Sequence, residues 1–300
     1  VGAALGPGPP TFAYFDIAAG PKGAVFASWL DLGAYAVRAA EYTRAGKKVD
    51  PWSDSTQRWA EQADLRFARS VDGGMNFVTS AVVDSIACIC CRTAVAAGSD
   101  GAAHLMWRHV FEGYQRDFVV ARAPSGEPPK APVRVHEDRW ELMGCPDIGP
   151  DLATDDQGGV HAAWYTAAPN FQGLHYALST NRGATFGPPV GILTGPSIPT
   201  SEVKLAVTGT TPWLVWEDQR AAPSKNPGPL WGDPSAKIRL RLGWITARGA
   251  LGQLPEPVGF GRSPAIAAGA GRLGVAWEDR GKIVVRLGRP RPRVQPQRTQ

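Results

Sequence analysis

The chain has 300 residues, of which 43% are hydrophobic and 20% charged, a balance that excludes an intrinsically disordered protein. No apolar run approaches the ~18 residues that a membrane-spanning helix needs. The net charge is +5, but residues 281–300 carry six basic side chains and no acidic one. Subtracting those six charges leaves a body near −1, so the basicity is terminal.

Repetition along the chain is the strongest structural pattern. Five segments share an apolar run, a small polar turn, a second apolar run and a tryptophan: residues 13–31, 92–109, 149–166, 203–220 and 264–280. Each predicts a β-hairpin. A third predicted strand follows each hairpin, at residues 65–70, 118–123, 174–179, 238–243 and 283–288.

A fourth predicted strand follows in most units, within residues 76–84, 131–138, 185–193 and 252–260. Repeated units of four antiparallel strands predict an all-β protein, a β-propeller with five visible blades. We expect either a sixth blade or closure by residues 1–12 pairing with the fifth unit. Residues 1–288 form the expected single domain. Residues 289–300 form a basic, proline-rich tail, which is a solubilising extension or a contact to an acidic partner or membrane surface.

Two turns between predicted third and fourth strands share a sharper motif, S-x-[DN]-x-G-x-x-F. They read SVDGGMNF (70–77) and STNRGATF (179–186). The Ser and Asp or Asn side chains are expected to bond the turn backbone, the Gly to allow a positive φ, and the aromatic ring to pack under the hairpin. The structural residues of this motif are Ser70, Asp72, Gly74, Phe77, Ser179, Asn181, Gly183 and Phe186.

These turns resemble the Asp-box of sialidase-like, BNR-repeat β-propellers. The arrangement of CxCC (88–91) followed by GCP (144–146) is similar to that of a bacterial exported group labelled sialidase-like. The resemblance implies an exported location, in the periplasm, at the cell envelope or secreted. In this family the boxes lie on the blade ends opposite the active site.

Sialidases of this fold use three arginines that clamp a carboxylate, a Tyr nucleophile beside a Glu, and an Asp acid/base. The residues that match these types are Arg92, Arg220, Arg280, Tyr114 and Tyr165. The family's first arginine lies in an N-terminal RIP-type motif, which this sequence lacks. We therefore expect a non-catalytic binding or scaffold protein, with an exo-sialidase-type glycoside hydrolase as the alternative. The adjacent carboxylates Glu217/Asp218 and Asp155/Asp156 should point apart on a strand, so they are not obvious acid/base pairs.

Strand order places the loops after each second strand and after each fourth strand on one rim. The long loops fall there, at residues 32–62, 109–117, 165–173 and 217–236. Such loops usually carry function. Their aromatic residues predict a surface for a glycan or a protein partner, or lids that pack on one another: Trp52, Trp59, Tyr114, Phe171 and Trp231. The basic tail lacks interleaved aromatic residues, which argues against nucleic acid.

The four cysteines are expected on the same rim. Cys88, Cys90 and Cys91 lie between the first and second units, and Cys145 lies in the equivalent loop between the second and third. Of the three full pairings, only 88–91 with 90–145 avoids a strained local bridge, and a single long bridge that leaves two free thiols is also open. The alternative is a thiolate site for copper or zinc that includes Met143, which predicts a metal-handling protein.

Overall fold

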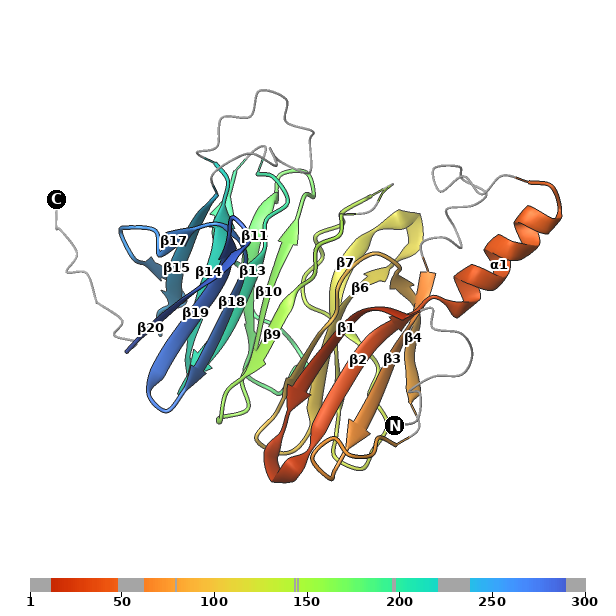
Figure 1. Ribbon diagram of the computed structural model, residues 1–300, viewed down its shortest axis with the longest axis horizontal. Coiled ribbons are helices and arrows are strands. Elements are labelled where there is room, and N and C mark those ends of the chain that lie inside the picture. Colours follow the sequence, from red (N-terminus) through yellow and green to blue (C-terminus); the bar gives the residue numbers. More distant parts are fainter. Residues whose placement is uncertain are drawn as a thin grey trace.

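Each of the five sequence repeats folds as a set of antiparallel strands in the computed structural model of the chain, and a single pairing, Ala87 with His109, joins the first two sets into one eight-stranded sheet. The structure describes residues 12–47, 62–78, 80–142, 144, 146–195, 198–220 and 238–289. The five sets are called blades 1 to 5, and Figure 1 shows them side by side in chain order. The β-propeller class predicted from the repeats is confirmed.

Blade 1 consists of β1 (Phe12–Ala19), β2 (Val25–Asp31), β3 (Gln62–Ser70) and β4 (Ala81–Cys88). Blade 2 consists of β5 (Ala94–Ala97), β6 (Ala103–Val110), β7 (Arg116–Ala123) and β8 (Val133–Arg134). Blade 3 consists of β9 (Asp151–Thr154), β10 (Val160–Thr166), β11 (Gly173–Ser179) and β12 (Val190–Thr194).

Blade 4 consists of β13 (Val203–Thr208), β14 (Thr211–Asp218), β15 (Arg239–Ile245), β16 (Leu251–Gln253) and β17 (Gly259–Phe260). Blade 5 consists of β18 (Arg262–Gly269), β19 (Arg272–Asp279) and β20 (Lys282–Gly288). Two 3₁₀ turns, Pro21–Gly23 and Glu112–Tyr114, and one helix, α1 (Gly33–Arg44), interrupt the strands. The helix lies within the long insert of blade 1, and none of its side chains is buried.

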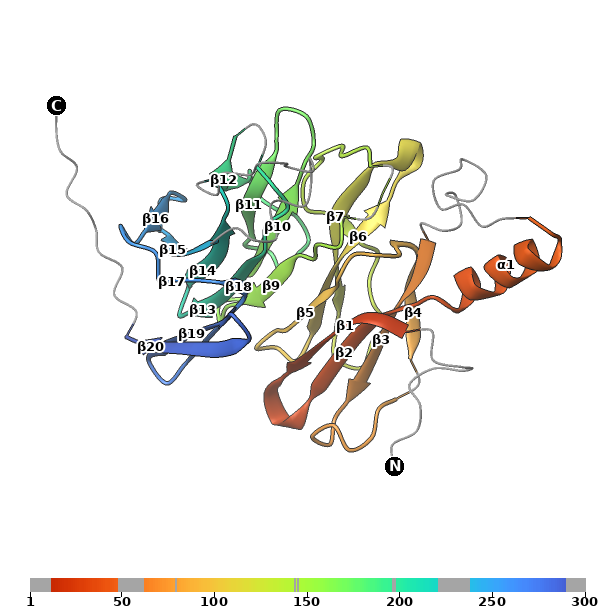
Figure 2. The same cartoon turned by 45° about the horizontal axis from the view of Figure 1, so that its top comes forward.

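The first strands of consecutive blades lie next to one another, β1 by β5, β5 by β9, β9 by β13 and β13 by β18. Figures 1 and 2 show the resulting arc of sheets, which is not closed in the part of the chain that the structure describes. Blade 5 has three strands there, and its β20 exposes Ile283, Val285 and Leu287. The predicted closure by residues 1–12 falls almost wholly outside the described residues.

The repeated tryptophan of each second strand is buried between blades. These residues are Trp29, Trp107, Trp164, Trp216 and Trp277, each at most 4% exposed. Aliphatic side chains of neighbouring blades surround most of them and form the successive layers of the core. Burial of a large aromatic side chain stabilises the fold by roughly 2–3 kcal/mol, so one tryptophan in each repeat tightens each blade contact.

Polar side chains also join neighbouring first strands. The Asp16 carboxylate on β1 accepts the backbone N–H of Val95 on β5 at 2.8 Å. Asp151 on β9 accepts the N–H of Leu205 on β13 at 2.6 Å in the same way. These bonds fix the first strands, which are the inner strands of the blades, relative to one another. They therefore also fix the loops that lead into these strands.

Candidate functional site

Four polar side chains from four different blades meet where the chain enters the inner strands. Tyr14 lies near the start of β1, and Arg92 lies two residues before β5. Asp147 lies four residues before β9, and Glu202 lies directly before β13. We call these residues the mouth cluster. Their meeting follows from topology, because the first strands lie next to one another and run from the same rim.

Tyr14 is directed into the cluster by an irregularity in its strand. The pairing of β1 with β2 shifts register between Ala13 and Asp16, and Tyr14 has a φ of 54°. Such a bulge re-aims a side chain, and it carries a strain that the surrounding structure must offset. The Thr93 hydroxyl donates to the Tyr14 carbonyl oxygen at 3.0 Å and holds this backbone in place.

The Tyr14 hydroxyl lies close to the carboxylate of Asp147. Burial raises the pKa of Tyr14, and the negative charge of Asp147 raises it further. The phenol therefore keeps its proton at neutral pH. Asp147 itself is exposed and has a φ of 45°, so its carboxylate is accessible from the rim.

Arg92 and Glu202 form the other half of the mouth cluster. The Arg92 Nη1 atom pairs with Glu202 Oε1, while 46% of the Arg92 side chain stays exposed. Burial lowers the pKa of Arg92, but the Glu202 carboxylate outweighs it and the net shift is upward. Gly149 is required beside this pair, because a Cβ there would lie 2.5 Å from the Cβ of Arg92. The glycine thus lets the loop before β9 approach Arg92 closely.

Glu217 lies directly beneath the mouth cluster, at the end of β14. Its side chain accepts the Ser263 N–H at 3.0 Å and the Glu202 N–H at 3.4 Å. Burial raises the pKa of Glu217 to about 7, and the charge of Glu202 contributes. A carboxyl group that holds its proton near neutrality is typical of a functional site, although here both oxygens also serve the backbone.

The cysteine loop is adjacent to the mouth cluster. Cys88 and Cys91 are buried free thiols, with their Sγ atoms 3.1 Å apart. Cys90 is disulfide-bonded, and its Sγ lies 4.0 Å from that of Cys88. The 88–91 bond of the full pairing is therefore absent, and the two free thiols agree with the alternative of a single bridge. Cys145 and Met143 lie outside the described residues. The three Sγ atoms are close enough to one another for a metal site, as the sequence allowed.

The three arginines predicted for a carboxylate clamp each pair with a different acidic residue. Arg92 lies in the mouth cluster. Arg220 forms two hydrogen bonds of 3.0 Å with Asp218 at the end of β14. Arg280 lies in the turn between β19 and β20, where 84% of its side chain is exposed and Asp279 lies 3.8 Å away.

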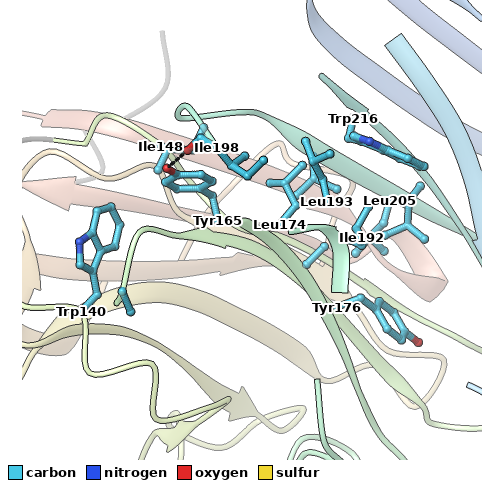
Figure 3. Close-up of a cluster of buried hydrophobic side chains, with 14 of the residues drawn as sticks. Trp140, Ile148, Tyr165, Leu174, Tyr176, Ile192, Leu193, Ile198, Leu205 and Trp216 are labelled. Atoms are coloured by element: carbon cyan, nitrogen blue, oxygen red, sulfur yellow. Dashed lines mark hydrogen bonds between the residues drawn. The ribbon is translucent and has the colours of Figure 1, made fainter. Parts of the chain in front are cut away.

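Neither of the two predicted tyrosines is part of the mouth cluster. Tyr165 is fully buried in the core, and its hydroxyl donates to the Ile198 carbonyl oxygen at 2.7 Å (Figure 3). Burial raises the pKa of Tyr165, so it is a packing residue with no access to a substrate. Tyr114 lies in the 3₁₀ turn between β6 and β7, where its carbonyl oxygen accepts the Leu142 N–H.

One aromatic residue of the predicted rim surface, Phe171, packs against two histidines. The Phe171 ring stacks on His175 with centroids 3.8 Å apart and on His136 at 4.6 Å. It also borders a pocket formed by residues 168–172, 194 and 195. Trp52, Trp59 and Trp231 lie outside the described residues.

The two serine turns have the same internal hydrogen bonds. The Ser70 and Ser179 hydroxyls each accept the backbone N–H four residues ahead, at 3.0 Å and 2.8 Å. Each hydroxyl also donates to the Asp72 or Asn181 side chain. The rings that follow pack on blade cores, Phe77 near Trp29 and Phe186 near Trp164. The glycines at the fifth position, Gly74 and Gly183, have φ of 87° and 83°.

Sequence reasoning named Arg92 and missed its three partners in the mouth cluster. Aligning the five repeats by their first strands would have found two of these partners. Asp147 and Glu202 stand within four residues of the inner strand that follows, as Arg92 does. Tyr14 would still have been missed, because a regular strand would direct it elsewhere and the bulge is not evident from the residues.

No protein-family model and no curated protein matches the chain. Among solved structures, an α-L-arabinanase of Penicillium chrysogenum, complexed with arabinobiose, is 14% identical, with a TM-score of 0.51 over 92% of this chain and 78% of that one. A GH93 α-L-arabinofuranosidase of Fusarium graminearum is 13% identical, with a TM-score of 0.51 over 92% and 77%.

A sialidase described as Hadza microbial is 12% identical, with a TM-score of 0.44, and this chain spans 66% of its length. The two arabinan-directed structures establish the fold as that of β-propeller glycosidases. In the part of the chain that the structure describes, no helix is long and apolar enough to cross a membrane.

Proposed function

We propose that the chain acts on carbohydrate at the mouth cluster, as a glycoside hydrolase-type enzyme. The observation that carries this proposal is the Tyr14 hydroxyl beside the accessible Asp147 carboxylate, next to the Arg92–Glu202 pair. The fold it shares with two arabinan-directed glycosidases supports the same class, although fold alone does not fix function.

In the proposed reaction Asp147 accepts the Tyr14 proton, and the Tyr14 oxygen bonds to the anomeric carbon as the glycosidic C–O bond breaks. The departing alcohol takes up a proton, and water then hydrolyses the bond between sugar and Tyr14, which restores the phenol and the Asp147 carboxylate. A phenol with a raised pKa is a weak nucleophile until a positioned base removes the proton. Arg92, with 46% of its side chain exposed, binds a hydroxyl or an anionic group of the sugar. Its pairing with Glu202 holds the guanidinium in place for that contact.

The substrate class favoured here is a neutral glycoside. A single arginine stands in the mouth cluster, whereas the sialidase-type clamp uses three. Glu202 already neutralises that arginine, which disfavours an anionic sugar such as sialic acid. The neighbouring solved structures that carry arabinobiose are consistent with a neutral substrate.

The test measures hydrolysis of fluorogenic arabinofuranosides and sialosides, and binding of the matching oligosaccharides by calorimetry. We expect Tyr14→Phe and Asp147→Asn to lower turnover by at least about 100-fold while oligosaccharide binding persists, because these groups act on the reacting bond. Tyr42→Phe, on the exposed helix α1, is the matched control and should retain full activity. Unchanged turnover in Tyr14→Phe would contradict the site.

Non-catalytic binding is the second candidate. Two observations favour binding without catalysis. Arg92 is already paired with Glu202, and Tyr14 keeps its proton, so neither group is in a reactive form. Binding without turnover of any substrate would establish it, and the rim would then serve a glycan or a protein partner. Export is part of either proposal and is supported by the disulfide at Cys90, since disulfides persist in oxidising compartments.

A further inference from the structure

The cysteine loop holds a pair of thiols with the spacing of a redox motif. Cys88 ends β4, and Cys91 follows in a turn closed by its own N–H, which donates to the Cys88 carbonyl oxygen at 3.4 Å. The turn brings the two Sγ atoms to 3.1 Å from each other. The separation of a disulfide bond is ~2.05 Å, so about 1 Å of closure joins them.

Two buried arginines face this pair. Arg116 Nη1 donates to the Cys88 Sγ atom at 3.4 Å. Arg108 lies nearby, only 1% exposed, and donates to the carbonyl oxygens of Arg116 and Tyr165. A buried guanidinium favours an anion next to it, and the Cys88 sulfur is in a position to supply that charge as a thiolate.

The two sulfur atoms therefore have different roles. A hydrogen bond with Cys91 and the charges of both arginines lower the pKa of Cys88 to about 5 despite its burial. Burial and the adjacent Cys88 charge raise the pKa of Cys91. One cysteine is a thiolate and the other a protonated thiol that donates to it, which is the arrangement of an attacking and a resolving cysteine.

We propose that Cys88 and Cys91 form a buried redox-active dithiol, which a low-molecular-weight disulfide oxidises to an intramolecular disulfide. Cys88 attacks one sulfur of the small disulfide, forms a mixed disulfide with it and releases one thiolate. That thiolate takes the Cys91 proton. Cys91 then attacks Cys88 Sγ and expels the second thiolate, which gains a proton from water. The protein loses two electrons, and the small disulfide becomes two thiols.

A metal ion is the competing occupant, and the charges around the pair argue against it. Structural zinc takes four ligands, whereas Cys90 is already disulfide-bonded and two thiols remain in the described cluster. A cation there would also lie beside the guanidinium of Arg116, 3.4 Å from Cys88 Sγ. Like charges at that distance repel in a buried site, while a neutral disulfide does not.

The experiment exposes the chain, purified without reductant, to oxidised glutathione and then quenches it in denaturant with an alkylating reagent. Reduction and a second, heavier alkylating reagent follow, and mass spectrometry locates each label. Before oxidation we expect the first label on Cys88 and Cys91 and the second on Cys90. After oxidation we expect the second label on all three, with no glutathione attached.

Two single variants distinguish the attacking cysteine from the resolving one. Cys91→Ser should accumulate one glutathione on Cys88, because nothing resolves the mixed disulfide. Cys88→Ser should react at Cys91 at least about tenfold more slowly, because it lacks the stabilised thiolate. Thermal melts of both variants check that they fold, and the labelling of the wild-type chain does not depend on them.

Three results would overturn the proposal. The first is a wild-type chain that keeps the first label on Cys88 and Cys91 after prolonged oxidation. The second is stoichiometric copper or zinc in the purified chain whose removal by a chelator exposes the two thiols. The third is faster reaction of Cys88→Ser than of Cys91→Ser. Each of these results is independent of any activity on carbohydrate.

Discussion

The two ends of the inner strands use polar side chains in opposite ways. At the hairpin end, the Asp155 carboxylate accepts the N–H groups of Gln157 and Gly159 at 2.9 Å and 2.6 Å. At the mouth, the charged side chains of Arg92 and Glu202 pair with each other. The first kind of contact satisfies the local backbone, and the second leaves an arginine accessible.

The difference indicates that polar side chains at the hairpin end stabilise the fold, whereas those at the mouth are available to a ligand. A side chain that caps its own turn is fully used by the fold, and its removal affects stability. The Arg92–Glu202 pair joins two side chains and holds no backbone group, so its removal should affect ligand binding more than stability. The following predictions test this division, beginning with the largest change in stability.

Glu217 is an exception to this division. It lies beneath the mouth cluster, yet its buried carboxyl group accepts backbone N–H groups, as Asp155 does at the hairpin end. Its pKa in the folded chain is about 7, above the ordinary value of 4.5. Between these values the folded chain holds a proton that the unfolded chain has lost. Raising the pH from about 4.5 to about 7 should therefore lower the free energy of unfolding by about 3 kcal/mol, and the loss persists above pH 7.

Glu217→Gln removes this titration and keeps an acceptor for Ser263. We expect denaturant curves of the variant and the wild-type chain to diverge as pH rises, with the variant gaining relative stability at pH 8. The comparison uses the difference between the two proteins, because Asp151, with its pKa raised to about 6 by burial, titrates in both. Parallel curves from pH 4 to pH 8 would contradict the prediction.

Asp155, at the hairpin end, should give the next largest effect. Asp155→Ala leaves the Gly159 and Gln157 N–H groups without their acceptor and removes a 3.2 Å contact to His161. Loss of a buried acceptor costs about 1–3 kcal/mol, and we expect about 2 kcal/mol by chemical denaturation. The exposed neighbour Asp156→Ala is the control and should change stability by less than about 0.5 kcal/mol.

The blades could be predicted from sequence because each feature occurs five times. A buried tryptophan, a polar turn and an apolar third strand are local patterns, and repetition distinguishes them from chance. The mouth cluster could not be predicted in the same way. It joins residues as far apart as Tyr14 and Glu202, and the positive φ of Tyr14 and Asp147 that helps to aim them has no local pattern in the sequence.

Tyr165 illustrates the opposite error. Residue type alone makes it a candidate nucleophile. Its strand, β10, is buried along its whole length, so the phenol is enclosed between blades and bonds to Ile198. Residue type indicates what a side chain can do, whereas burial by the neighbouring blade decides whether a substrate can reach it.

The smallest expected effect concerns the serine turns. Ser179 is fully buried and accepts the Gly183 N–H at 2.8 Å, while its own hydroxyl donates to Asn181. Ser179→Ala should destabilise the fold by about 1 kcal/mol, the net value of a hydrogen bond of this kind, as measured by thermal or chemical denaturation. Ser70→Ala should cost the same, because the hydrogen bonds of its turn match.

Ser125→Ala, at an exposed position, serves as the control and should leave stability unchanged. Neither Ser179→Ala nor Ser70→Ala should alter ligand binding or turnover, since both turns lie at the hairpin ends of their blades. A loss of binding in the fully folded Ser179→Ala variant would show that the hairpin end reaches the ligand. The separation of a structural end from a functional end would then be wrong.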